Sequence, residues 1–230
     1  MNTPTIEQML KAGMHFGHRT SKWHPKMKPY IFGVRNGVHV IDLIKSRKML
    51  ENSLELIKKF SAEGKTILFV GTKMQAKKHI KALATETGMP YVSEKWMGGC
   101  LTNFAVLRRM TKKYRDLISD KAMGNLSKYT KKERLDIDKN IHKLDIKVGG
   151  VADMSKMPDL MFVWGVKDES TAIIEARKKN IPIIGVCDTN TNPDPVNYII
   201  PSNDDATKTI KLILGAVKEA IDEGKNTPKA

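Results

Sequence analysis

The chain has 230 residues, a length that suits one sizeable domain with an appendage or two small domains. Its formal charge of +15 at pH 7 indicates an acidic partner, either nucleic acid or an anionic membrane. No apolar run approaches the ~20 residues of a bilayer span, and the opening MNTPTIEQML lacks the regions of a secretory signal, so we expect a soluble protein.

The two cysteines, Cys100 and Cys187, lie far apart and predict neither a disulfide framework nor a cysteine zinc site. Cys187 is inside the apolar run IPIIGVCD, where a small core residue fits. This usage is consistent with a reducing compartment.

The first predicted element is a short helix over residues 3–12. Thr5 is suited to cap it, and Ile6, Met9 and Leu10 would share one apolar face. A stretch of different composition follows directly.

That stretch, residues 13–42, is called the basic segment here. No Asp or Glu occurs between Gln8 and Ile41, and recurrent glycines disfavour an ordinary helix. Its cations and histidines are Arg19, Lys22, Lys26, Lys28, Arg35, His15, His18, His24 and His39, and its aromatic residues are Phe16, Trp23, Tyr30 and Phe32. This composition predicts RNA binding, because cations displace the counterions of phosphates and bases stack on aromatic rings. The alternative is a basic surface loop whose aromatic rings are buried in the core.

Beyond the basic segment the pattern is that of α/β units. GVHVIDL predicts a short strand, and Asp42 begins a helix over residues 43–63 that Gly64 ends. The apolar stripe of this helix is predicted to contain Leu43, Ile44, Met49 or Leu50, Leu54, Ile57 and Phe60. The continuous apolar run in KTILFVGTK predicts a strand covered on both faces. A helix over residues 73–87 and a strand in PYVSEKW complete a βαβ unit.

Residues 103–150 follow a different pattern, with apolar residues at alternating spacings of three and four. The two seams are Leu107, Met110, Tyr114 and Leu117, and Ile137, Ile141, Leu144 and Val148. Thr130 and Glu133 form a capping box for the second helix. The pattern predicts an antiparallel coiled-coil hairpin. Cations outnumber acids about two to one outside the seams, which favours nucleic-acid contact over a plain solvated face.

The last third returns to α/β units. Strands are predicted in PDLMFVWG, IPIIGVCD and NYIIP, and helices over residues 168–179 and 204–221. Ser202 and Asp205 suggest a cap for the final helix. The tail GKNTPKA is predicted to be disordered.

These elements predict an α/β fold, a parallel central sheet with helices on both faces of flavodoxin-like or Rossmann-like type. Residues 1–102 and 151–230 would form one domain that includes the basic segment, and residues 103–150 an inserted coiled-coil hairpin.

Such a sheet also allows enzyme chemistry, but its motifs are incomplete. FVGTKMQAKK matches neither G-x-G-x-x-G nor a P-loop, so Lys73, Lys77 and Lys78 are better explained by an ordinary βα turn than by a phosphate site. No serine lies in a nucleophile elbow. We therefore expect no catalytic residue and no cofactor.

Two groups could ligate a metal. The first is Asp188, Asp194, Asp204 and Asp205 after a strand, for which helix N-terminal and turn chemistry is favoured over a hard cation. The second is His15, His18 and His24, whose stretch offers no cysteine or carboxylate as a further ligand. RNA contact or structural hydrogen bonding is favoured there, and no metal site is predicted.

Several motifs resemble one known family. They are GMHFGHRTSKWHPKMKPYIFGVRNGVHVIDL, FVGTK, KWMGGCLTNF and the segment from PDLMFVWG through NIPIIGVCDTNTNPDPVNYIIPSNDDA. In order and spacing, from about residue 5 to 223, they are similar to ribosomal protein two of the small subunit in its bacterial and organellar form. The resemblance implies a structural, non-enzymatic protein at the head-body junction of the subunit. It would bind ribosomal RNA late in assembly and help to dock the large mRNA-binding protein.

We therefore predict a ribosomal RNA-binding protein that serves translation in the small subunit, in the cytoplasm or in an organelle stroma or matrix. The predicted partners are small-subunit ribosomal RNA and neighbouring proteins, with no membrane. The predicted RNA-binding residues are Arg19, Lys22, Trp23, His24, Lys26, Lys28, Arg35, Lys95, Trp96, Arg108, Arg109, Lys112 and Lys113. The alternative is an α/β enzyme or nucleotide-binding protein that uses the carboxyl edge of the sheet.

Overall fold

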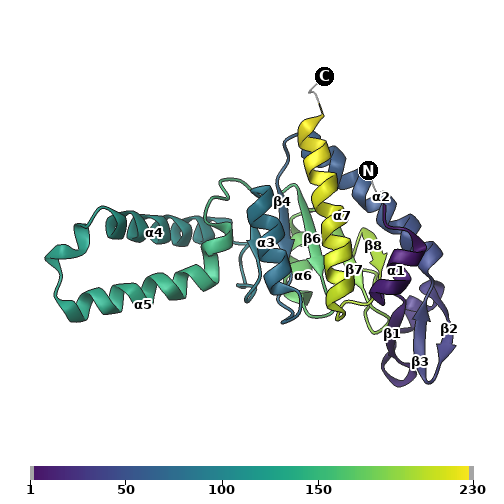
Figure 1. Cartoon of the computed structure of the whole chain (residues 1–230). Helices are drawn as coiled ribbons and strands as arrows, with labels where there is room; N and C mark the ends of the chain where they lie inside the picture. The colour runs from purple at the N-terminus through teal and green to yellow at the C-terminus, as the bar shows by residue number, and fades with distance from the viewer. Residues whose placement is uncertain (1–2, 228–230) are drawn as a thin grey trace.

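The structure is a computed structural model, and it describes residues 3–227. At its centre five parallel strands form one sheet in the order β5-β4-β6-β7-β8 (Figure 1). The strands are β4 Ile67–Val70, β5 Tyr91–Val92, β6 Leu160–Trp164, β7 Ile183–Cys187 and β8 Tyr198–Pro201. β4 and β6 come from the two predicted α/β blocks and pair directly, with Ile67 opposite Leu160. The predicted α/β fold with one parallel sheet is confirmed.

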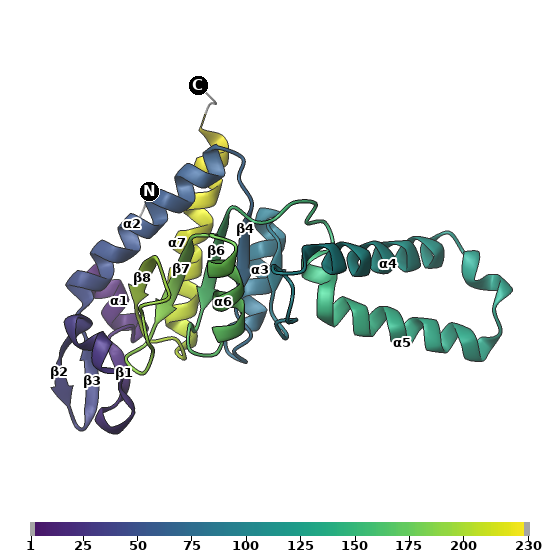
Figure 2. The ribbon, with the colours of Figure 1, turned by 180° about the vertical axis from the view of Figure 1, so that it is seen from behind.

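Helices cover both faces of this sheet (Figures 1 and 2). Three of them pack on one face and α6 on the other. Their bounds are α2 Leu43–Ala62, α3 Lys77–Thr87, α7 Thr207–Asn226 and α6 Ser170–Lys178. Successive residues of a strand point to opposite faces of the sheet and so belong to two separate hydrophobic cores. Phe69 packs beneath α2, α3 and α7, and Leu68 packs on the face that α6 covers. Because both faces are buried, the central strands are apolar along their whole length.

The caps predicted for the first two helices are present. α1 Ile6–Ala12 begins after Thr5, whose side chain accepts from the backbone N–H of Gln8, and α2 begins after Asp42. The predicted apolar faces are partly wrong. In α1 only Met9 is buried, and in α2 the side chain of Ile44 is 72% exposed.

Two predicted helix starts are too early. α3 begins at Lys77 rather than residue 73, because residues 73–76 form a turn in which the N–H of Ala76 donates to the carbonyl of Lys73. α7 begins at Thr207, and the Ser202–Asp205 cap is wrong. Asn203 instead accepts the backbone N–H groups of residues 205 and 206.

The C-terminal tail is helical at its start. α7 continues to Asn226, so the predicted disorder is wrong for residues 224–226. Thr227 follows as the last described residue, and residues 228–230 of that prediction lie outside the described residues.

The basic segment folds into a small antiparallel sheet that the sequence interpretation missed. Its strands, β1 Phe16–Arg19, β2 Ile31–Arg35 and β3 Val38–Ile41, pair in the order β1-β3-β2. Only β3 was predicted. Asn36 and Gly37, with φ values of 51° and 73°, make the tight turn between β2 and β3. Two short 3₁₀ turns, Thr20–Lys22 and Pro25–Tyr30, link β1 to β2.

Two long helices project from the opposite end of the central sheet (Figures 1 and 2). They are α4 Phe104–Ala122 and α5 Lys131–Val148, and the Thr130–Glu133 capping box is present. Seam residues Leu107 and Val148 are buried near the base, whereas seam residues Leu117 and Ile137 are half-buried farther out. Coiled-coil packing and domain boundaries at residues 103 and 150 stay predictions.

Within residues 3–227, none of the helices combines the length and apolar composition that crossing a bilayer requires.

Candidate nucleic-acid interface

Thr189, just after β7, makes several of the contacts that hold the basic segment against the carboxyl end of that strand. The backbone N–H of His24 donates to the Thr189 carbonyl at 2.8 Å, and the N–H of His18 donates to its hydroxyl at 2.8 Å. Gly17 lies so close that a Cβ atom there would be 2.5 Å from the Thr189 methyl carbon. The small sheet is therefore seated on the main domain at a fixed position.

All five predicted RNA-binding cations of the basic segment are exposed. Lys26 forms an ion pair with Asp194. The other four, Arg19, Lys22, Lys28 and Arg35, have no ion-pair partner among residues 3–227. An exposed cation without an internal partner is available to a phosphate.

The predicted stacking groups of the segment are half-buried and take part in local contacts. The Trp23 ring lies 5.0 Å from the His39 ring, centroid to centroid. His24 accepts the backbone N–H of Lys26 through its Nδ1 atom at 3.3 Å. Both side chains thus help to hold the shape of the segment.

Trp96 lies on the other side of the molecule, in the loop between β5 and α4. Its side chain is 9% exposed, and its indole N–H donates to Glu175 Oε1 at 3.0 Å. This placement favours a structural role for Trp96 over stacking on RNA. The neighbouring Lys95 is exposed.

The base of α4 carries a groove of about 380 Å³, called the α4 groove here. It is lined by Ala105, Arg108, Arg109, Thr111, Lys112, Arg115, Met154 and Ser155. Arg108, Lys112 and Arg115 follow one another at spacings of four and three, so they share one face of the helix. No described carboxylate lines the groove. Lys113, also predicted, is exposed but does not line it.

The predicted RNA-binding residues therefore fall into two groups. The basic segment lies at the β8 end of the central sheet, whereas α4 projects from the opposite end (Figures 1 and 2). The α4 groove therefore lies far from the basic segment. One partner that contacts both groups must span the whole sheet. A long, folded polyanion meets that requirement more readily than a small ligand does.

The carboxyl edge of the sheet is the place where this fold class binds ligands, at the point where strand order reverses between β4 and β6. Lys73, which follows β4, extends there. Its Nζ atom lies 2.7 Å from Asp204 Oδ1, 2.9 Å from Asp205 Oδ1 and 3.6 Å from Asp168 Oδ2. The protein's own ion pairs thus occupy this position. Nothing in this geometry supports the alternative prediction of a nucleotide site.

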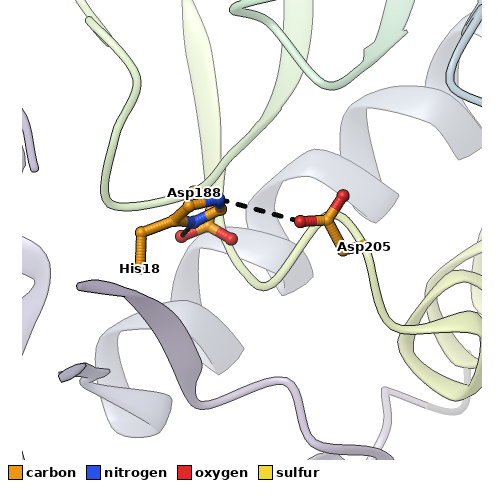
Figure 3. A group of neighbouring side chains, drawn as sticks. All are labelled: His18, Asp188 and Asp205. Atoms are coloured by element: carbon orange, nitrogen blue, oxygen red, sulfur yellow. Dashed lines mark ion pairs between the residues drawn. The ribbon is translucent and has the colours of Figure 1, made fainter. Parts of the chain in front are cut away.

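Beside Lys73, three potential metal ligands meet. His18 Nδ1 is 3.1 Å from Asp188 Oδ1, and His18 Nε2 is 3.7 Å from Asp205 Oδ2 (Figure 3). One ligand atom from each of these residues lies within 4.8 Å of the others, and imidazole and carboxylate are donors that divalent cations accept. His15, His18 and His24, for which a metal site was considered and not predicted, are not assembled there. The Nδ1 atom of His24 accepts the backbone N–H of Lys26, and the Asp194 carboxylate forms an ion pair with the Lys26 side chain.

Two pKa values at this edge shift in the same direction. Burial and the charge of Asp188, opposed by Lys73, raise the pKa of Asp204 from 3.8 to about 6. Contact with the Asp188 carboxylate, opposed by burial, raises the pKa of His18. In both cases the folded state binds a proton more tightly than the unfolded chain does.

We expect Asp204 and His18 to stabilise the protein as the pH falls from neutrality, against a smaller opposing effect of His15, whose pKa is lowered by burial. Since the folded pKa of Asp204 exceeds the unfolded one, the free energy of unfolding should rise by about 1 kcal/mol between about pH 7.5 and about pH 5.5. His18 acts in the same sense, because its contribution is complete at low pH and is lost as the pH rises through its folded pKa. Urea titrations in a chelating buffer test this. Asp204→Asn should remove most of the rise, and a loss of stability across this window would contradict the assignment.

Three residues that shape this candidate interface were not singled out in the sequence. Arg115 could have been assigned to the same basic helix face from the sequence, because it lies three residues after Lys112 and Lys112 lies four after Arg108. Glu175 stands out only as a charged residue among the buried alanines of α6. Nothing in the local sequence identifies Thr189 as a docking residue.

Comparison with known proteins gives one consistent result. A family model described as ribosomal protein S2 matches residues 9–224. The chain is 46% identical over 225 residues to the small ribosomal subunit protein uS2 of Coprothermobacter proteolyticus, covering 98% of this chain and 84% of that protein. It is also 46% identical over 222 residues to the uS2 protein of Endomicrobium trichonymphae, covering 96% and 91% of the two chains.

Proposed function

Because the chain belongs to the ribosomal protein S2 family, we propose that it binds small-subunit ribosomal RNA through the α4 groove and the basic segment. The protein is a structural constituent of the small ribosomal subunit and not an enzyme. The finer parts of the proposal are the residues that contact RNA, the position at the head-body junction, the protein neighbours and the host compartment, cytoplasm or organelle.

The α4 groove is the observation that carries the proposal. It collects Arg108, Arg109, Lys112 and Arg115 in one concave surface without an acidic residue in its described lining. Like charges at a spacing of four repel one another on a free helix. Approaching phosphates would remove this repulsion and release condensed counterions, which favours binding.

The basic segment supplies the second proposed RNA surface. Its exposed cations lie on β1, β2 and the 3₁₀ turns, and the Thr189 contacts fix them relative to the main sheet. Such preorganisation lowers the entropy that binding must overcome.

The outer face of the small sheet supports a protein neighbour instead. Phe16, Phe32 and Val34 are 53%, 80% and 56% exposed, and together with Leu10 and Val40 they line an open depression of about 790 Å³. Exposed apolar patches commonly mark protein interfaces. We assign this face to a neighbouring small-subunit protein, with the large mRNA-binding protein as the proposed occupant.

Binding should depend steeply on salt. We expect affinity for small-subunit particles that lack this protein to fall by about a thousandfold between roughly 50 and 200 mM monovalent salt, as for ~6 or more phosphate contacts. Filter binding or sedimentation across that range measures the slope. A flat dependence would refute the electrostatic mechanism, and failure to bind the particles at any salt concentration would refute the proposed function.

A further inference from the structure

We propose that Glu175 is a positioning residue for the RNA interface, which fixes the loop of residues 95–103 and thereby the base of α4. This inference rests on the proposed binding of RNA at the α4 groove. Its structural part, the order of the loop, can be measured without RNA.

A single carboxylate receives five hydrogen bonds from this loop. Glu175 Oε1 accepts the Trp96 indole N–H at 3.0 Å and the Gly99 backbone N–H at 2.7 Å. Oε2 accepts the backbone N–H groups of Leu101 and Thr102 and the Thr102 hydroxyl, each at 3.0 Å. The carboxylate comes from α6, more than 70 residues farther along the chain.

Both terminal atoms of the side chain at position 175 must accept hydrogen bonds. Glu175 is 5% exposed, and every group that faces it in these bonds is an N–H or O–H donor. Burial alone would raise its pKa, but the bonds from Thr102, Trp96, Gly99 and Leu101 outweigh burial and lower the pKa. A carboxylate only accepts hydrogen bonds, whereas a glutamine amide would direct two N–H donors at groups that also donate.

The loop also buries the apolar side chains of Trp96, Cys100 and Leu101, but it has few other polar contacts. Two backbone bonds cross it within the described residues, from Cys100 N–H to the Met97 carbonyl and from Asn103 N–H to the Gly99 carbonyl. Gly99 has a φ of 88°, so the turn uses a backbone conformation that side chains disfavour. The Asn103 side chain makes no cap bond to α4. The carboxylate is therefore the main polar anchor of the loop.

The loop leads directly into the first turn of α4. Lys95 precedes Trp96, and Arg108 follows the N-terminal residue Phe104 by one turn. Lys95, the first residue of the anchored loop, and Arg108, beyond its other end, thus take their positions from it. When the anchor is lost, we expect the α4 base to move, while the α5 end stays packed through Gly150, which lies against Tyr91.

Glu175→Gln tests the proposal, and Glu169→Gln is a matched control. Glu169 lies at the start of the same helix, is 2% exposed and accepts the Thr72 N–H at 2.7 Å, but it serves the loop after β4. We expect hydrogen exchange of the Gly99, Leu101 and Thr102 amides to accelerate about tenfold or more in Glu175→Gln alone. Affinity for small-subunit particles that lack this protein should weaken by about tenfold or more, with a shallower salt slope.

The outcomes distinguish a failure of the positioning role of Glu175 from a failure of the proposed RNA binding. If the wild type binds and Glu175→Gln loosens the loop yet binds equally well, positioning is overturned. Unchanged amide exchange in Glu175→Gln, or an equal loss of affinity in Glu169→Gln, overturns it as well. If the wild type itself does not bind, the proposed function fails, and the exchange experiment still decides whether Glu175 orders the loop.

Discussion

Replacing Arg108, Arg109 and Lys112 by Gln together should weaken binding to small-subunit particles by roughly a hundredfold or more at about 0.1 M salt. Each lost phosphate contact costs about five- to eightfold at that concentration and removes ~0.7 to 0.9 from the logarithmic salt slope. The slope should therefore become shallower by about two to three. Quantitative binding at four or more salt concentrations measures both effects.

The folding of this variant should be intact. Gln is a good helix former, and removing the like charges at positions 108 and 112 relieves repulsion in the free protein. The melting temperature should thus stay the same or rise slightly. A matched triple variant, Arg47→Gln, Lys48→Gln and Lys59→Gln, removes three exposed cations from α2. Equal losses in the two variants would show that net charge, and not the α4 groove, governs binding.

A second large effect is expected at the carboxyl edge. Lys73→Met should lower the free energy of unfolding by about 3 kcal/mol at neutral pH, because it leaves a buried carboxylate without its cation. The Lys73 side chain is 17% exposed and that of its partner Asp204 is 2% exposed. Urea unfolding monitored by circular dichroism provides the measurement. The loss should shrink at mildly acidic pH, where Asp204 takes up a proton.

Lys77→Met provides the comparison for this variant. Lys77 lies one turn farther along and pairs at 3.0 Å with Glu94, whose side chain is 45% exposed. A pair of that kind contributes about 0.5 kcal/mol or less, since solvent screens it. If the two variants were equally destabilised, the ion pairs of Lys73 with Asp204, Asp205 and Asp168 would contribute no more to stability than an exposed pair does.

The elements of the main sheet were predictable because their signals are local. Continuous apolar runs mark β4, β6 and β7, and the capping residues Thr5, Asp42 and Thr130 mark helix starts within a few positions. The small sheet was missed for a physical reason as well. β1 and β2 expose apolar side chains such as Phe16 and Phe32, so they lack the alternation of a half-buried strand. The Asn36–Gly37 pair was the available hairpin signal.

The candidate site was less predictable, because its decisive contacts join distant residues. Charge and composition correctly identified exposed cations in the basic segment and on α4. They could not show that Lys26 is paired with Asp194, that Trp96 faces Glu175, or that Lys73 neutralises Asp204. Each partner is at least 70 residues away, and no periodicity reports such a pairing.

The order of the elements along the chain, with α4 and α5 between β5 and β6, constrains the order in which the two surfaces can form during synthesis. The hairpin helices contact each other locally and can pack early, whereas β4 pairs with a strand 93 positions later, Ile67 with Leu160. The residues that line the α4 groove have all been made once Ser155 is translated, and the anchor Glu175 follows, but the contacts of the basic segment need Thr189 and Asn203. Although the basic segment is translated first, we expect it to reach its final form later than the α4 groove does.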